Sequence, residues 1–362
     1  MAVEARLDAW LKALHDRGGS DILLMDDSKP LLRIEGALRP LEEAEPLTGE
    51  EIEAIARTQI DDQYGDRLHL GREVEFSFTW REQSRIRASA YYQRNTCAMS
   101  LRRNPLRIPG LAELGLPPEV GSLLSGRHGL ILVTGQAGSG KSTTMAAMVD
   151  AINRTESCHI VTIEDPVEFV HPNQMAAVSQ REIGTDTRSY ATALRAVRRE
   201  DPDVVMVGEI SDADTIAAVL DIAESGHRVI GALTINDSVS CLDRLIEVFP
   251  PSRRDQVRVQ LAGTLLAVVY QRTVPRVDGG LVSAYELLIG LPSVRRLIRE
   301  DHMSHLRELL AAGEPAGMQT LERSLSDLVE KGVIDLQTAV DASLYPQDLS
   351  VPAVMAPSLS NL

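Results

Sequence analysis

The chain of 362 residues is poor in cysteine, in aromatic side chains and in positive charge, and it has no long apolar run. Its three cysteines, Cys97, Cys158 and Cys241, form no Cys-x-x-Cys pair, so the sequence indicates neither a disulfide framework nor a zinc site. The longest uncharged apolar stretch runs from Leu261 to Tyr270, well short of the roughly 18 residues of a membrane-spanning helix. We therefore expect three plain buried thiols and no membrane span.

The charge balance bears on the class of partner. Lysine and arginine number 37 against 52 aspartates and glutamates, which gives a formal charge of −15. A surface that is acidic as a whole repels polyanions, so we expect no nucleic-acid partner; only a local basic groove would escape this argument. The N-terminal stretch has the pattern of an amphipathic helix and lacks the basic start, apolar run and cleavage site of a signal peptide. These features favour a cytoplasmic protein.

Hydrophobic patterning predicts an α/β protein with two domains. Residues 1–101 have helical ends around a strand-rich middle, which predicts a smaller α+β domain. Residues 102–117 are rich in proline and are expected to be a linker. Residues 118–345 alternate short β-branched runs with helical segments and become mainly helical over the last hundred residues, which predicts a mostly parallel sheet with helices on both faces. Residues 346–362 are expected to be a flexible tail.

One short motif, GQAGSGKST, is typical of a phosphate-binding loop. It fits G-x-x-x-x-G-K-[ST], follows an expected strand over residues 130–134 and opens an expected helix. The glycines let backbone N–H groups point inward, Lys141 reaches the outer phosphates, and Ser142 offers its hydroxyl to Mg²⁺. An accidental glycine-rich turn is the alternative, and the flanking strand and helix count against it. We expect ATP and Mg²⁺ here, on Gly135, Gln136, Ala137, Gly138, Ser139, Gly140, Lys141, Ser142 and Thr143.

Hydrolysis also needs a carboxylate that orients or deprotonates water, and two are placed at expected strand ends. Glu164 follows the expected strand 159–163, and Glu209 follows the expected strand 204–207. The carboxyl ends of parallel strands meet at the edge where ligands bind. A solvated turn carboxylate and a residue beside a helix start are the plain alternatives. We expect Glu209 to be the catalytic base, and Glu164 to serve in hydrolysis and at the metal.

Taken together, these motifs resemble those of one family, the secretion and type IV pilus ATPases, and within it the pilus retraction ATPases. The resemblance covers nearly the whole chain. It is carried by SDILLMDDSKPLLRIEGAL, by the Walker A stretch GQAGSGKSTTMAAM, by the Asp box TIEDPVEFVH, by the Walker B stretch REDPDVVMVGEISDADT, and by LLIGLPSVRRLIRED and AGMQTLERSL near the C-terminus.

The resemblance implies a PAS-like N-terminal domain, a RecA-like ATPase domain, and a homo-hexameric motor that retracts type IV pili in twitching motility. It also implies a position at the inner face of the cell membrane, with an inner-membrane pilus platform protein and a paralogous ATPase as partners. Arg85 and Arg87 are two apart and so share one face of a strand. The resemblance implies that they, together with Arg102, reach the neighbouring subunit's nucleotide as arginine fingers; a solvated sheet face is the alternative.

The stretch GHRVIGALTIND departs from the family pattern. His227 agrees with the family's His box, and the resemblance implies a catalytic role for it; the alternative is a polar residue after a helix-ending glycine. Thr234 stands where family members usually carry a second histidine. Histidine can carry a proton near neutral pH, whereas threonine can only hydrogen-bond. The change bears on the coupling of hydrolysis to motion and leaves nucleotide binding untouched.

Several functions therefore stay open. The leading hypothesis is the active retraction motor, favoured by Glu164 and Glu209. A nucleotide-binding accessory subunit of a ring, with weak turnover of its own, is favoured by the altered His box. A pilus extension or type II secretion ATPase is the third, although these usually carry a four-cysteine zinc insertion that three scattered cysteines cannot build. A small-molecule kinase is the fourth, and nothing beyond the phosphate loop indicates an acceptor pocket.

Overall fold

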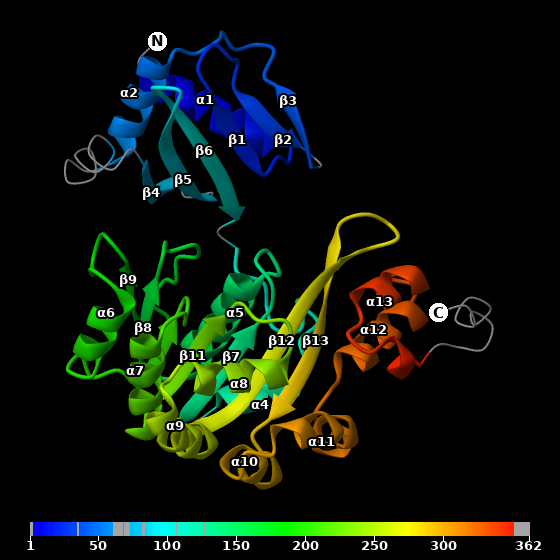
Figure 1. The fold of residues 1–362 in the computed structure, drawn as a ribbon. Coiled ribbons are helices and arrows are strands. Elements are labelled where there is room, and N and C mark those ends of the chain that lie inside the picture. The colour runs from blue at the N-terminus through cyan, green and yellow to red at the C-terminus, as the bar shows by residue number, and fades with distance from the viewer. Residues whose placement is uncertain are drawn as a thin grey trace. The chain divides into compact units, whose positions relative to one another are not determined.

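The computed structural model describes residues 3–34, 36–60, 68, 73–81, 84–105, 107–125 and 128–350. The chain forms two compact units, each with its own sheet (Figure 1). Unit 1 comprises Met1–Arg107 and Pro166–Val170, and unit 2 comprises Ile108–Asp165 and His171–Leu362. The predicted fold class, an α/β phosphate-loop domain preceded by a smaller α+β domain, is confirmed. Within the described ranges, every helix is too short or too polar to cross a bilayer.

Unit 1 is an antiparallel sheet of six described strands, in the order β3-β2-β1-β6-β5-β4, with the described helices α1 and α2 packed on it. Its elements are α1 (Val3–Asp16), β1 (Asp21–Leu24), β2 (Leu31–Ile34), β3 (Ala37–Pro40), α2 (Gly49–Gln59), β4 (Glu73–Trp80), β5 (Ser84–Gln93) and β6 (Thr96–Pro105). Helix α2 begins at a capping box, because Thr48 Oγ1 accepts from Glu51 N and the Glu51 carboxylate accepts from Thr48 N. Strand β6 continues to Pro105, so it enters the segment 102–117 that we expected to be a linker.

Unit 2 contains a sheet of seven described strands in the order β13-β12-β7-β11-β10-β8-β9, all parallel except β13. Its first elements are α4 (Glu119–Leu124), β7 (Gly129–Thr134), α5 (Lys141–Thr155), β8 (His159–Glu164), β9 (Ala177–Glu182), α6 (Tyr190–Val197), β10 (Val204–Val207), α7 (Ala213–Glu224), β11 (Arg228–Leu233), α8 (Ser238–Glu247), α9 (Pro251–Thr264), β12 (Leu265–Pro275) and β13 (Leu281–Ile289). The expectation of a mainly helical last hundred residues is wrong for β12 and β13, which form a long antiparallel pair.

Both faces of this sheet are buried, which explains the continuous apolar runs of its strands. Along β7, Leu130 and Leu132 pack with α6, α7, α8 and α9, whereas Ile131 and Val133 pack with α4 and α5 on the other face. The alternation follows from the two-residue period of a strand. Strands β7, β8, β10 and β11 therefore hold their carboxyl ends at one edge, fixed from both sides by helices.

The C-terminal helices follow β13 (Figure 1). They are α10 (Pro292–Arg299), α11 (Leu306–Ala312), α12 (Leu321–Glu330) and α13 (Leu336–Ala342), with the 3-10 turns η1 (Met303–His305), η2 (Glu314–Ala316) and η3 (Pro346–Asp348) between and after them. Of the predicted tail, residues 346–350 are described, and Ser350 N donates to Ser326 Oγ of α12 at 3.0 Å. Residues 351–362 lie outside the described residues.

Candidate nucleotide-binding site

The glycine-rich motif connects β7 to α5 at the carboxyl edge of the sheet. Gly140 is the N-cap of α5 with φ of 87°, a left-handed conformation that favours glycine. A Cβ on Gly135 would lie 2.5 Å from the backbone oxygen of Gln271, so that position has no room for a side chain. The loop therefore curls over the N-terminus of a 15-residue helix, which is the geometry that binds phosphate.

The side chain of Lys141 folds back over the phosphate loop. Its Nζ donates to the backbone oxygens of Gly135 at 2.9 Å and Gln136 at 3.0 Å. Partial burial lowers the pKa of Lys141, and the nearby carboxylate of Glu209 opposes that shift. The ammonium is thus held at the mouth of the loop, with Glu209 within electrostatic reach.

The two predicted carboxylates lie at the same edge. Val207 of β10 pairs with Ile163 of β8, so the strands end level with each other and bring Glu164 and Glu209 to one side of the phosphate loop. The side chain of Glu164 is buried, whereas Glu209 is exposed. Gly208 approaches so closely that a Cβ there would lie 3.3 Å from Glu164 Cα. The structure therefore groups the phosphate loop, Glu164 and Glu209.

The two His-box positions separate to opposite edges. Thr234 follows β11 at the carboxyl edge, because Leu233 pairs with Thr134 just before the phosphate loop. His227 precedes β11 at the amino edge, with its Nδ1 3.0 Å from Ser225 Oγ and 3.1 Å from Ile222 O. Six residues of strand, about 20 Å, lie between the two edges. His227 therefore lies at the edge opposite the phosphate loop of its own subunit, and its catalytic role stays a prediction.

Arg85 and Arg87 share a face of β5, as their spacing predicted. Arg85 donates to Val167 O at 3.3 Å and to two hydroxyls of β4. Arg87 donates to Glu75 Oε2 at 2.9 Å and lies 3.7 Å from Glu168 Oε1. Both arginines therefore have partners within unit 1, and two of these partners, Val167 and Glu168, belong to the Asp-box stretch.

Arg102 lies on β6, directly opposite Arg87 in the strand register. It is largely exposed and donates through Nε to Asp21 Oδ1 at 2.8 Å. The structure thus brings Arg87 and Arg102 together on neighbouring strands, but each is held by a carboxylate of unit 1. Their role toward a neighbouring subunit stays a prediction.

Several residues that the sequence did not point to donate hydrogen bonds to groups of the site. The Oε1 atom of Glu164 accepts from Thr162 Oγ1 at 2.6 Å and from Gln180 Nε2 at 3.0 Å. The carbonyl of Ser139 in the phosphate loop accepts from Gln271 Nε2 and from Thr273 Oγ1. A glutamine placed directly after the apolar run LLAVVY is the sequence signal that points to Gln271.

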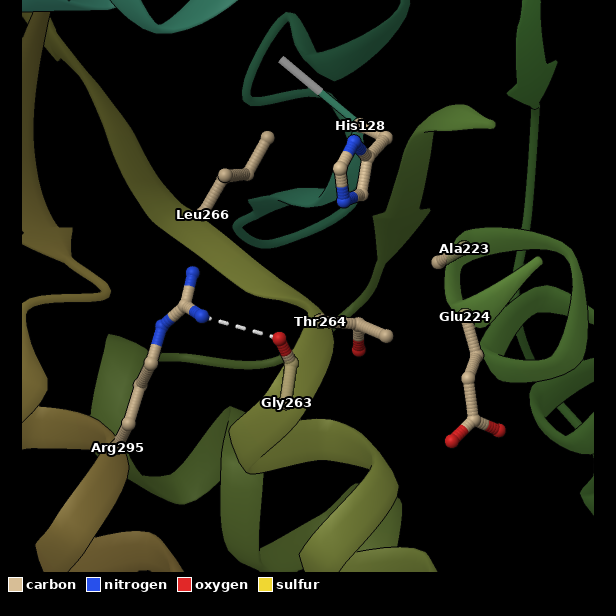
Figure 2. A pocket seen from close by; sticks show the side chains of 7 residues that line it. All are labelled: His128, Ala223, Glu224, Gly263, Thr264, Leu266 and Arg295. Atoms are coloured by element: carbon tan, nitrogen blue, oxygen red, sulfur yellow. Dashed lines mark hydrogen bonds between the residues drawn. The ribbon is translucent and has the colours of Figure 1, made fainter. Parts of the chain in front are cut away.

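A separate pocket of about 520 Å³ lies at the amino edge of the sheet (Figure 2). Its lining residues are His128, Ala223, Glu224, Gly263, Thr264, Leu266 and Arg295. Figure 2 shows the hydrogen bond that Arg295 donates to the carbonyl of Gly263. Arg295 also donates to the carbonyls of Gly290 and Leu265, at 2.8 Å each. The length of β7 separates this pocket from the phosphate loop, so it is not part of the nucleotide site.

Comparison with known proteins agrees with this geometry. Residues 4–313 match the family described as Type II/IV secretion system protein. The chain belongs to the type II/IV secretion system protein family. Among relatives in this family, the type IV pilus retraction ATPase PilT of Pseudomonas aeruginosa is 37% identical over 92% of this chain and 96% of its own length. The type IV pilus ATPase PilU of the same organism is 35% identical over 94% of this chain and 89% of its own length.

A solved structure shows the same fold. The crystal structure of the pilus retraction motor PilT with bound ADP superposes with a TM-score of 0.88 at 40% sequence identity, over 94% of this chain and 98% of that one. The expected membership of the secretion and pilus ATPases is thereby confirmed, and so is the two-domain ATPase fold of that family.

Proposed function

We propose that this chain is the ATP-hydrolysing subunit of a motor that retracts type IV pili. The observation that carries the proposal is the grouping of a phosphate loop, Glu209 and Glu164 at one sheet edge, in a chain that resembles a retraction ATPase over nearly its full length. Both carboxylates that hydrolysis needs are present at this edge. That favours a working motor over an accessory subunit that only binds nucleotide.

Each group at the edge has a distinct part in the proposed reaction. The N–H groups of the loop and the Lys141 ammonium bind the β- and γ-phosphates of ATP, and they offset the negative charge that develops on the transferred group. The Ser142 hydroxyl, in the first turn of α5, would hold Mg²⁺. Mg²⁺ would supply further charge neutralisation between the two phosphates.

The two glutamates differ in a way that divides their roles. Glu209 is exposed at the carboxyl edge, so water can reach the carboxylate that would take the proton. Glu164 is buried and its carboxylate is held by Thr162 and Gln180, so its geometry is constrained. We assign Glu209 as the general base, and Glu164 as the residue that orients water or the metal shell.

The motor is further proposed to be a homo-hexamer that works peripherally at the cytoplasmic face of the inner membrane, on a platform protein of the pilus base. A paralogous ATPase is a proposed partner, since PilU of Pseudomonas aeruginosa is similar over most of this chain. In such a ring, Arg85, Arg87 and Arg102 would act on the neighbouring subunit's nucleotide after exchanging their present partners. Thr234 is the observation that favours the second candidate, an accessory ring subunit with weak intrinsic turnover.

Steady-state ATPase activity, measured together with the mass in solution, tests the proposal. Glu209→Gln is expected to keep ATP bound and to lower turnover at least about a hundredfold, which is the low end for a positioned general base. Glu308→Gln, on the exposed side of α11, makes the same chemical change away from the nucleotide edge and is expected to leave turnover unchanged. A wild-type chain that binds ATP and hydrolyses none would support the accessory subunit instead.

A further inference from the structure

In the phosphate loop and on the two strands beside it, three buried polar atoms have no hydrogen-bond partner among the described residues. They are Thr134 Oγ1, Ser139 Oγ and Gln271 Oε1. Buried polar groups are normally hydrogen-bonded, because burial without a partner costs stability. Gln271 is 1% exposed and directly follows the apolar run LLAVVY of β12, so an apolar side chain would fit this buried position better. Stability alone therefore does not explain why this position carries a glutamine.

The contacts of Gln271 supply that reason. Tyr270 pairs with Thr134, so Gln271 lies level with Gly135, the first residue of the loop. Its Nε2 donates to the carbonyl oxygen of Ser139, and a Cβ on Gly140 would lie only 3.2 Å from that nitrogen. Strand β12 therefore contacts both ends of the phosphate loop. Its backbone lies close to Gly135, and the side chain of Gln271 contacts Ser139 and Gly140.

The carbonyl of Ser139 has a second donor from the same strand. Thr273 Oγ1 donates to it at 2.9 Å, and its side chain is half-buried. Two donors on one carbonyl fix the direction of the peptide plane between Ser139 and Gly140. In a planar trans peptide, the C=O and the following N–H point in opposite directions. Holding the Ser139 oxygen toward β12 therefore turns the Gly140 N–H away from β12, toward the phosphate side of the loop.

We propose that Gln271 is a positioning residue for the nucleotide, which sets the inward direction of the loop N–H groups by holding the carbonyl of Ser139. The inference rests on the proposed function, since it assumes that this loop binds ATP. It assigns to β12 a part in binding that the motif itself does not contain. Gln271 acts only through the loop and does not touch the nucleotide.

The test separates binding from stability. Gln271→Met keeps the length of the side chain, removes the donor, and also removes the partnerless Oε1. We expect the Kd for Mg-ATP to rise about tenfold, equal to about 1.4 kcal/mol. We expect the thermal midpoint without nucleotide to stay equal to that of the wild type or to rise. A residue that only packs the core would change the thermal midpoint and leave the Kd unchanged.

Two further variants keep the result interpretable. Gln319→Met removes a comparable donor to a backbone carbonyl, that of Tyr285 at 2.9 Å, and is expected to lower the thermal midpoint without changing the Kd. Thr273→Val removes the second donor to Ser139 and is expected to raise the Kd by about threefold, which tests the same carbonyl if the methionine variant does not fold.

The outcomes are distinct. A wild-type chain that binds no ATP contradicts the proposed function itself. Wild-type binding with a Kd within twofold for both Gln271→Met and Thr273→Val overturns the role of β12 and leaves the proposed function standing. A raised Kd in Gln271→Met with an unchanged or higher thermal midpoint supports the inference.

Discussion

Replacing Arg307 by methionine is expected to be one of the most destabilising single changes in unit 2. Arg307, on α11, donates to Glu286 Oε2 of β13 at 3.1 Å and to Glu322 Oε2 of α12 at 2.7 Å. The two glutamate side chains are only 2% and 1% exposed. The ring of Tyr345 covers the guanidinium, 4.2 Å from ring centre to Cζ. The substitution would therefore leave two carboxylates buried without the cation between them.

The size of the expected stability loss depends on the hydrogen bonds that the two carboxylates keep. Removing one partner of a buried ion pair costs about 3–5 kcal/mol. Glu286 would still accept from Ser238 N at 3.2 Å, and Glu322 from Leu344 N at 3.2 Å and Tyr345 N at 3.1 Å. These remaining bonds place the expected loss at the lower end, about 3 kcal/mol. For a domain of this size that corresponds to a thermal midpoint roughly 6–12 °C lower.

The loss should depend on pH. Burial raises the pKa of Glu286, and the charge of Arg307 opposes that shift, so its removal raises the pKa further. A carboxyl whose pKa is higher in the folded than in the unfolded chain reduces stability as pH rises above the unfolded value of about 4.5. The difference between Arg307→Met and wild type should therefore be larger at pH 8 than at pH 5.5.

Scanning calorimetry of the nucleotide-free chain at both pH values would measure this. Arg276→Met is the matched control, because Arg276 forms an exposed pair with Asp278 and loses the same charge. Its thermal midpoint should stay at the wild-type value. The reasoning would be refuted by an Arg307→Met midpoint within 2 °C of wild type, or by a loss of equal size at both pH values.

Four further predictions concern the nucleotide site and the first unit. Lys141→Ala should abolish ATP binding in a calorimetric titration with no loss of thermal midpoint; unchanged affinity would contradict the phosphate-loop assignment. Arg85→Ala should lower turnover more than ATP affinity, and mixing with Lys141→Ala subunits should restore activity; no rescue would favour a role inside unit 1. Thr234→His should raise the ATPase rate, with the gain changing near pH 6.5, the unperturbed histidine pKa; equal rates of both proteins from pH 5.5 to 8.5 would remove Thr234 from the coupling. Thr48→Ala should cost unit 1 about 1 kcal/mol in urea unfolding, because the N-cap of α2 loses its acceptor; no change would show that the capping box does not contribute.

Much of the site was predictable because its signals are local. The phosphate loop is continuous in sequence and needs particular backbone angles, so its glycines mark it directly. Glu164 and Glu209 each follow an apolar β-branched run, and parallel strands place such positions at one edge. The His-box pattern did not separate His227 from Thr234. His227 precedes β11 and Thr234 follows it, so the two residues lie at opposite ends of the strand.

Gln271 and Gln180 were not predictable in this way, because each reaches the site from another strand of the sheet. Gln271 meets Ser139 across 132 positions, and Gln180 meets Glu164 from β9, a strand that the patterning did not identify. Strand β12 was also hidden, because it follows helix α9 directly and periodicity does not separate a short apolar run of a strand from the end of a buried helix. No local propensity states which strand becomes the neighbour of β7.

By itself, the sequence determined the chemistry that this protein can offer: a phosphate loop, two acidic strand ends and an arginine pair on one face of a strand. Those features depend on backbone angles and on the two-residue period of a strand, both of which act over a few residues. Only the tertiary structure decided the strand order that inserts β7 between β12 and β11, and with it which side chains support the loop. Strand order is set by burial of both sheet faces at once, a property of the whole unit and not of any segment.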